Sequence, residues 1–273
     1  MDESVTTANG ISNAGTLNNS AVLSSAVALN GGTLNLIGNS ARVTGAVTGT
    51  AGSVINVNGN YTTENAFGAD TLNIANGVVF NARHALGATT ALNNNGTLDV
   101  RAATPISLTG NYVQSASGIY SMEAQSNSQY GRLNVSGTAS LPANANIFVD
   151  VTSGASLTNG VLPGVITSSG LTASTFNVTD NSVLFDFTGV INGNNVDLDV
   201  KRGLSVTQVA QNASNSPAIG AAGALDAIIA QGATGDMAHV INQLGGLTSQ
   251  DQSTKPSRKC CRWWRAAPPQ PRP

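Results

Sequence analysis

A short motif, in which an Asn or Asp stands between two apolar residues, recurs along most of the chain. Clear copies are Leu34-Asn35-Leu36, Ile55-Asn56-Val57, Leu72-Asn73-Ile74, Leu98-Asp99-Val100, Leu133-Asn134-Val135 and Leu198-Asp199-Val200. A degenerate copy stands at Gly15-Thr16-Leu17-Asn18. Repetition on this scale indicates one supersecondary unit stacked many times, so that each unit buries its apolar residues on its neighbours.

The composition is unusual for a globular domain. Charged residues make up 10% of the 273 residues and aromatic residues 4%, whereas a typical soluble domain contains about 25% charged residues. Disordered chains are poor in β-branched residues and usually highly charged. Here Val, Ile and Leu alternate with polar residues along most of the chain, and the formal net charge is only -2. The sequence therefore predicts a long, thin apolar core.

The spacing of the motif distinguishes between all-β architectures. Copies begin at residues 34, 55, 72, 98 and 133, giving intervals of 21, 17, 26 and 35 residues. The shorter intervals match the ~20 residues of one solenoid turn, whereas a β-sandwich would show turn signals every ~8–12 residues. We predict an all-β, single-stranded parallel β-helix. The apolar motif residues stack inward, and the middle residue faces solvent, where Asn and Thr can form hydrogen-bonded ladders.

Two short helices are expected after this region. The first spans residues 216–230, with Ser216 as N-cap and Pro217 at the first helical position. The second begins at Asp236 and ends before Gly245-Gly246. Its apolar residues recur at helical spacing: Met237, Val240, Ile241 and Leu244.

The composition changes abruptly after Thr254. Six of the 12 Lys and Arg residues follow it, whereas all 14 acidic residues precede it, so residues 1–254 carry 6 minus 14, or -8. Both Cys and both Trp also lie in this tail, and the body therefore has no thiolates for disulfides or metals. A basic, Trp-containing run can bind nucleic acid or an anionic membrane. The interpretation that we favour is a disordered, frameshifted tail over residues 251–273 that binds no nucleic acid.

Residues 111–201 resemble the C-terminal, autochaperone part of a bacterial autotransporter passenger domain. The resemblance rests on the order and spacing of four segments: Tyr112-Val113-Gln114, Gly118-Ile119-Tyr120, Tyr130 to Ala139, and Asn195 to Val200. It implies a right-handed β-helix that type V secretion exports to the cell surface. In that family a helix such as 217–230 leads into a C-terminal β-barrel translocator, which we expect to be missing here, as is a signal peptide.

The sequence pattern and the resemblance together predict a division of the chain into five parts. We expect a disordered N-terminus at 1–10, passenger repeats at 11–110, autochaperone-like turns at 111–203, a helical linker at 204–250 and the tail. The expected function is that of a non-enzymatic adhesion or virulence stalk, a surface protein associated with the outer membrane in intact homologues. Its expected partners are ligands on host or neighbouring cells.

No catalytic motif stands out, and we predict no catalytic, cofactor-binding or metal-binding residues. His84 and His239 are expected at the surface. Asp197 and Asp199 share one face of a strand, which we expect to be solvated although the pair could bind a cation. The alternative functions are a polysaccharide lyase or hydrolase and a trimeric, phage-type fibre. The charged groups available to an enzyme are isolated in sequence, and we expect no cluster of them on consecutive turns: Arg101, Arg132, Asp180 and Asp186.

Tyrosines are the remaining candidates for ligand binding, since aromatic residues are common in binding sites. All four lie in the middle third of the chain: Tyr61, Tyr112, Tyr120 and Tyr130. In a thin solenoid such side chains more often fill the larger turns of the core. We therefore predict that they pack inside.

Overall fold

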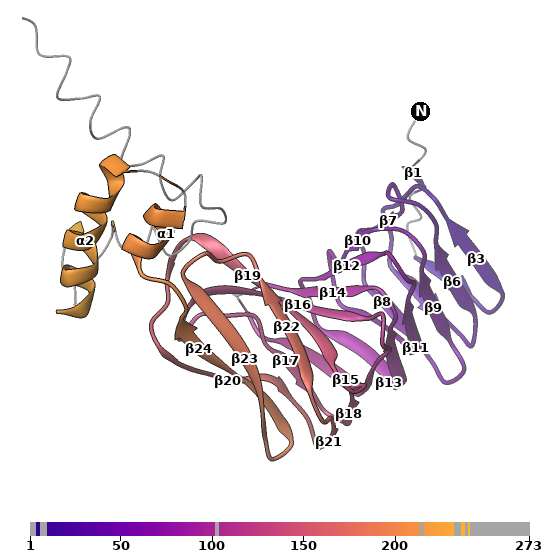
Figure 1. The fold of residues 1–273 in the computed structure, drawn as a ribbon. Coiled ribbons are helices and arrows are strands. Elements are labelled where there is room, and N and C mark those ends of the chain that lie inside the picture. The colour runs from indigo at the N-terminus through magenta and orange to yellow at the C-terminus, as the bar shows by residue number, and fades with distance from the viewer. Residues whose placement is uncertain are drawn as a thin grey trace, which may run out of the picture.

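The computed structural model describes residues 4–5, 10–101, 104–212, 214, 216–231, 236–237 and 240. They form an elongated, mostly β protein, with the first strands at one end and two short helices at the other (Figure 1). The expectation of an all-β architecture followed by short helices is thus confirmed for the described part. Residues 251–273, the predicted disordered tail, lie outside it.

The strands form three sheets, in which nearly all pairs are parallel. The smallest sheet contains β1 (Ser4–Val5), β4 (Val22–Leu23) and β7 (Arg42–Val43). A six-stranded sheet contains β10 (Tyr61–Thr62), β12 (Val79–Ala82), β14 (Thr97–Val100), β16 (Ile119–Ser126), β19 (Ala145–Ser156) and β22 (Phe176–Asp180). Strand β1 lies inside the range predicted to be a disordered N-terminus and pairs with β4.

The largest sheet has 15 strands. Its main path runs through β2 (Ile11–Asn13), β5 (Val27–Leu29), β8 (Val47–Gly49), β11 (Phe67–Ile74), β13 (Leu86–Asn94), β15 (Ile106–Gln114), β17 (Leu133–Val135), β20 (Gly160–Thr167), β24 (Asn195–Arg202) and β23 (Phe185–Asn192). Beside this path lie β3 (Thr16–Asn19), β6 (Thr33–Leu36), β9 (Val54–Val57), β18 (Thr138–Ser140) and β21 (Gly170–Thr172). Strand β11 joins the two rows, because its first half pairs with β8 and its second half with β9.

The recurring motif sets the register of this sheet. Its first apolar residues lie opposite one another at Leu17, Leu34, Ile55, Leu72, Leu92 and Tyr112, which are 17, 21, 17, 20 and 20 residues apart. The longer intervals of 26 and 35 residues separate motif copies that lie in different sheets. Leu98 pairs with Phe80 in the six-stranded sheet, and Leu133 pairs with Ile106.

Apolar side chains from all three sheets form one continuous core. The predicted packing of the four tyrosines is confirmed, because each is at most 5% exposed. Tyr112 also joins a buried polar network, in which its hydroxyl accepts a hydrogen bond from Asn94 at 3.0 Å and donates one to Gln114 at 2.9 Å. Burial raises the pKa of Tyr112 above its usual value, so this hydroxyl stays a donor at neutral pH.

Asparagine side chains in the middle of the motif form a ladder along the outside of the sheet. Each Nδ2 donates to the Oδ1 of the preceding paired strand, from Asn35 to Asn18 at 2.7 Å, Asn56 to Asn35 at 2.8 Å, Asn73 to Asn56 at 2.9 Å and Asn93 to Asn73 at 2.8 Å. The predicted ladder is therefore present. Except for exposed Asn18, its members are half-buried, which is less solvated than expected.

Replacing Asn56 with alanine should lower the free energy of unfolding by about 1–2 kcal/mol, because it removes two half-buried hydrogen bonds. Urea denaturation followed by circular dichroism measures this change. Thr48→Ala, an exposed position in neighbouring strand β8, is the control and should change stability by less than about 0.5 kcal/mol. Equal losses in the two variants would show that the ladder contributes nothing of its own.

The stack closes at its C-terminal end with antiparallel strands and helices. Strand β24 pairs antiparallel with both β20 and β23. Helix α1 (Val206–Asn212) was not predicted, whereas α2 (Ser216–Ala230) coincides with the first predicted helix. The Asp226 carboxylate of α2 accepts hydrogen bonds from the backbone N–H groups of Val206 and Thr207, at 2.8 and 2.9 Å. This long-range cap explains why a seven-residue helix is stable.

Of the second predicted helix, the described residues 236, 237 and 240 are helical. The rest of that prediction, including Ile241 and Leu244, lies outside the described residues.

Candidate functional site

The outer face of the six-stranded sheet presents the side chains that the core does not use. In β19, Ile147 and Val149 are fully buried, and Asn146, Phe148 and Asp150 alternate with them and are half-buried. Successive side chains of a strand point to opposite faces. The second set therefore lies on the outer face.

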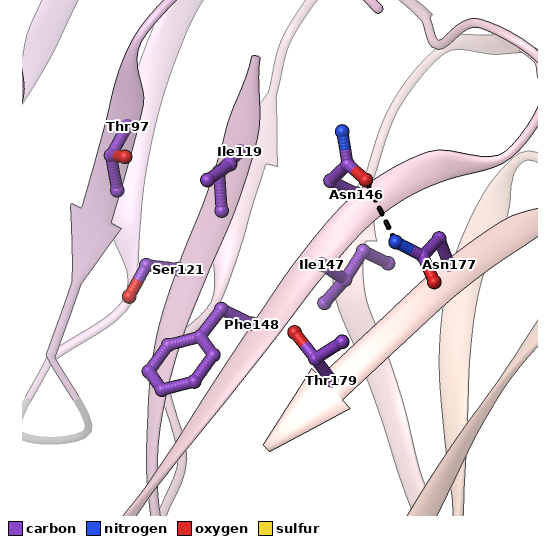
Figure 2. A pocket seen from close by; sticks show the side chains of 8 residues that line it. All are labelled: Thr97, Ile119, Ser121, Asn146, Ile147, Phe148, Asn177 and Thr179. Carbon is purple, nitrogen blue, oxygen red and sulfur yellow. Dashed lines mark hydrogen bonds between the residues drawn. The ribbon is translucent and has the colours of Figure 1, made fainter. Parts of the chain in front are cut away.

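A hollow of about 340 Å³ lies on this face, over the strands β14, β16, β19 and β22. Figure 2 shows its lining, which consists of Thr97, Ile119, Ser121, Asn146, Ile147, Phe148, Asn177 and Thr179. None of these side chains is charged. The hollow thus combines apolar surface with hydroxyl and amide groups, which is the usual chemistry of a small-molecule site.

Phe148 is the largest side chain of this lining. It lies in register with Ser121 of β16 on one side and with Thr179 of β22 on the other, and Figure 2 shows its ring between them. All four tyrosines and the phenylalanines 67, 80, 185 and 187 are buried. Phe176 is half-buried but packs against the core. Among the described residues, half-buried Phe148 is therefore the aromatic residue that does not belong to the core.

Two amides at one end of the hollow are held in fixed orientations. Asn146 donates from Nδ2 to the carbonyl oxygens of Ala116 and Gly118, at 3.0 and 3.3 Å. Its Oδ1 accepts a hydrogen bond from Nδ2 of Asn177 at 2.9 Å, the bond drawn in Figure 2. These bonds distinguish the nitrogen from the oxygen in each amide. The Nδ2 of exposed Asn177 is used in the bond to Asn146, and its Oδ1 is therefore held in a fixed position as a hydrogen-bond acceptor.

A cluster of charged residues adjoins the hollow on the same face. Asp99 accepts hydrogen bonds from Arg83 at 2.7 Å and from the hydroxyl of Ser121 at 2.9 Å. Arg101 lies 3.5 Å from Asp99 and 3.8 Å from Glu123. The expectation that Arg101 is isolated is wrong, because the sheet brings residues from three successive strands together. This proximity cannot be recognised without the register of the strands.

Other expected site residues lie apart from this cluster. Asp197 is only 5% exposed and accepts hydrogen bonds from the N–H of Gly164 and the amide of Asn192, at 2.7 and 2.8 Å. The expected solvated face is therefore wrong for Asp197. Arg132 lies with its guanidinium 5.4 Å from the ring centre of Tyr130. His84 is exposed, as expected, and His239 lies outside the described residues.

The carboxyl group of Asp180 is partly buried and titrates above its usual range of pH. Burial, together with the nearby Asp186 carboxylate, raises the pKa of Asp180 from 3.8 to about 6, although a hydrogen bond from the N–H of Ser182 opposes this shift. The folded state therefore binds the proton more tightly than the unfolded state. The contribution of Asp180 to stability is complete below about pH 4 and is lost as the pH rises through about 6.

Asp180→Asn should consequently raise the free energy of unfolding at pH 7 by about 1 kcal/mol, since the half-exposed carboxylate is screened by solvent. At pH 4 the variant and the wild type should be equally stable. Urea denaturation at the two pH values measures this difference. A gain that is the same at both pH values would contradict the assignment to the charge of Asp180.

Metal binding has no support in the described part of the chain, where no three His, Cys, Asp or Glu residues lie close enough to hold an ion. In the same part, no helix is long and apolar enough to cross a membrane. No family model matches the sequence, and neither the curated proteins nor the solved structures include a significant match.

Proposed function

We propose that this chain is the passenger segment of a bacterial autotransporter, folded as a right-handed single-stranded parallel β-helix. Its function is that of a non-enzymatic stalk displayed on the cell surface, where it mediates adhesion to host or neighbouring cells. An intact homologue would carry a C-terminal β-barrel translocator. The observation that carries the proposal is the continuous register of the motif, from Leu17 to Tyr112, on successive parallel strands.

The chemistry of the surface supports a binding role. The arginines beside the hollow are held in ion pairs, since Arg83 pairs with Asp99 and Arg101 lies between Asp99 and Glu123. Side chains held in such pairs are less suited to proton transfer than the separate acid and base of a hydrolase. The elongated shape in Figure 1 is also suited to holding a binding surface away from a cell.

An adhesion assay tests the proposal. Beads coated with the full chain should adhere to cultured epithelial cells, or to bacteria that display the chain, at least several-fold more than beads coated with albumin. If beads coated with the chain adhered no better than beads coated with albumin, the adhesive function would be overturned. An experimental structure would test the right-handed β-helix separately.

A polysaccharide-active enzyme is the second candidate, because Arg101 and two carboxylates adjoin an open hollow. Acidic polysaccharides incubated with the pure chain provide the test. Reproducible turnover that Arg101→Ala abolishes would favour the enzyme over the stalk.

A further inference from the structure

We propose that the hollow over β16, β19 and β22 binds a neutral glycan, with one sugar ring stacked on Phe148. The inference deepens the proposed adhesive function and rests on it for the biological role of the site. The proposed ligand is an uncharged hexose unit of a cell-surface glycan.

The aromatic ring is the first reason. A pyranose carries C–H groups on its faces, and these are attracted to the negative face of an aromatic ring. Phe148 belongs to the outward set of β19, and its neighbours in register, Ser121 and Thr179, are much smaller. A core role does not explain this position, because the buried residues on either side, Ile147 and Val149, already supply the inward apolar surface.

Polar groups around the ring are the second reason. Sugar hydroxyls both donate and accept hydrogen bonds, so they are recognised by side chains that offer both functions. Thr179 and Asn177 are exposed at the margin of the hollow. Asn177 presents an oriented amide, because its Nδ2 is bonded to Asn146.

The charge distribution selects neutral over acidic sugars. No charged side chain lines the hollow. Three carboxylates stand on the adjoining outward positions of β14, β16 and β19, those of Asp99, Glu123 and Asp150. Two guanidiniums lie beside them, those of Arg83 and Arg101, which directly follow β12 and β14. The net charge beside the hollow is therefore 2 minus 3, or -1, which disfavours uronic and sialic acids.

The backbone of this sheet argues against an extended peptide. Strands β14, β16 and β19 pair on both sides, so their N–H and C=O groups are used in the ladders. Strand β22 is the last strand of this sheet, so a peptide strand could add only beside it and not over the hollow. A peptide adds as a strand only at an open sheet edge. A ligand on this face is consequently recognised by side chains, as a glycan would be.

A panel of immobilised oligosaccharides tests the proposal with the full chain. The probes are glucose-, galactose- and mannose-terminated oligosaccharides, together with sialylated and uronate-containing counterparts, read by biolayer interferometry. Wild type should bind at least one neutral probe and bind its acidic counterpart more weakly. Phe148→Ala and Phe148→Leu should each weaken this binding at least tenfold, whereas Phe148→Trp should keep it within about threefold.

Val113→Ala is the matched control, because Val113 is an exposed apolar side chain on the outer face of the largest sheet. It should leave binding unchanged, and circular dichroism should show every variant folded. The proposal is overturned if no neutral probe binds, if only acidic probes bind, if Phe148→Leu binds like wild type, or if Val113→Ala matches Phe148→Ala.

The bead assay distinguishes this proposal from the adhesive function. Beads that adhere equally well with wild type and with Phe148→Ala would leave adhesion standing and remove the glycan site as its cause. Loss of adhesion after protease treatment of the cells, with none after glycosidase treatment, would assign it to a protein ligand. Phe148-dependent glycan binding without bead adhesion would keep the site and overturn the adhesive function.

Discussion

Replacing Gly110 with alanine should lower the free energy of unfolding by at least about 3 kcal/mol. Gly110 in β15 has a φ of 117°, a region that L-residues rarely adopt. A Cβ at this position would lie 1.7 Å from the carbonyl oxygen of Ala88 in β13. Because the obstacle is backbone in a paired strand, the two strands must separate locally to accommodate the methyl group.

Substitutions at two other glycines distinguish the two causes of the lost stability, the positive φ and the close approach of neighbouring backbone. Gly77 has a φ of 75° but nothing within 4 Å of its Cβ position, and Gly15 has neither a positive φ nor a close neighbour. We expect Gly77→Ala to cost about 1 kcal/mol and Gly15→Ala less than about 0.5 kcal/mol. Urea denaturation of the three variants measures the series. A Gly110 variant no less stable than the Gly77 variant would show that β13 and β15 separate easily.

The parallel stacking could be predicted because the motif is local and regular. Leu34, Ile55 and Leu72 each occupy the first position of a copy, and the structure places them opposite one another. The next two strands could not be assigned in the same way. Their third motif position holds Asn94 and Gln114, which a search for apolar residues passes over.

These polar residues are tolerated inside because their amide N–H groups are hydrogen-bonded, although the Oδ1 of Asn94 is buried without a partner. Gln114 donates to the carbonyl oxygens of Gly118 and Asn146, and Asn94 donates to that of Ile119. A buried amide without such bonds would cost about 1–3 kcal/mol. The partners come from other strands, so the sequence alone cannot show that they are present.

The candidate site was predictable only in part. The alternation in β19 already places Phe148 on the face opposite to Ile147 and Val149, and this signal was available in the sequence. Its neighbours Ser121 and Thr179 depend on the pairing of β19 with β16 and β22. The same pairing brings Arg101 to Asp99 and Glu123, which is why residues isolated in sequence form a cluster in space.

The two ends of the stack differ in the size of their layers. From β1 to β10 the strands contain two to four residues. Further along, β15, β16, β19, β20, β23 and β24 contain eight to 12 residues each, whereas β17, β18, β21 and β22 contain three to five. Longer strands bury more apolar surface per layer, and each layer of a stack is stabilised mainly by its neighbours. The C-terminal part should therefore be the more stable template.

Cutting the chain between residues 103 and 104 tests this asymmetry and should have the largest effect of all. The cut breaks no strand, since β14 ends at Val100 and β15 begins at Ile106. We expect the fragment 104–273 to fold alone, with a β-type circular dichroism spectrum and resistance of its β region to limited proteolysis. The fragment 1–103 should remain unfolded, because its last strands β13 and β14 lose the layer formed by β15 and β16, and, apart from β11 and β13, its strands contain at most four residues.

Mixing the two fragments supplies the control. If the C-terminal part acts as a template, fragment 1–103 should become protease-resistant in the mixture, to an extent that rises with the concentration of fragment 104–273. The Gly110→Ala form of fragment 104–273 should template less well, because Gly110 faces Ala88 across the cut. A fragment 1–103 that resists proteolysis alone would overturn the template argument, since its turns would then bury enough apolar surface by themselves.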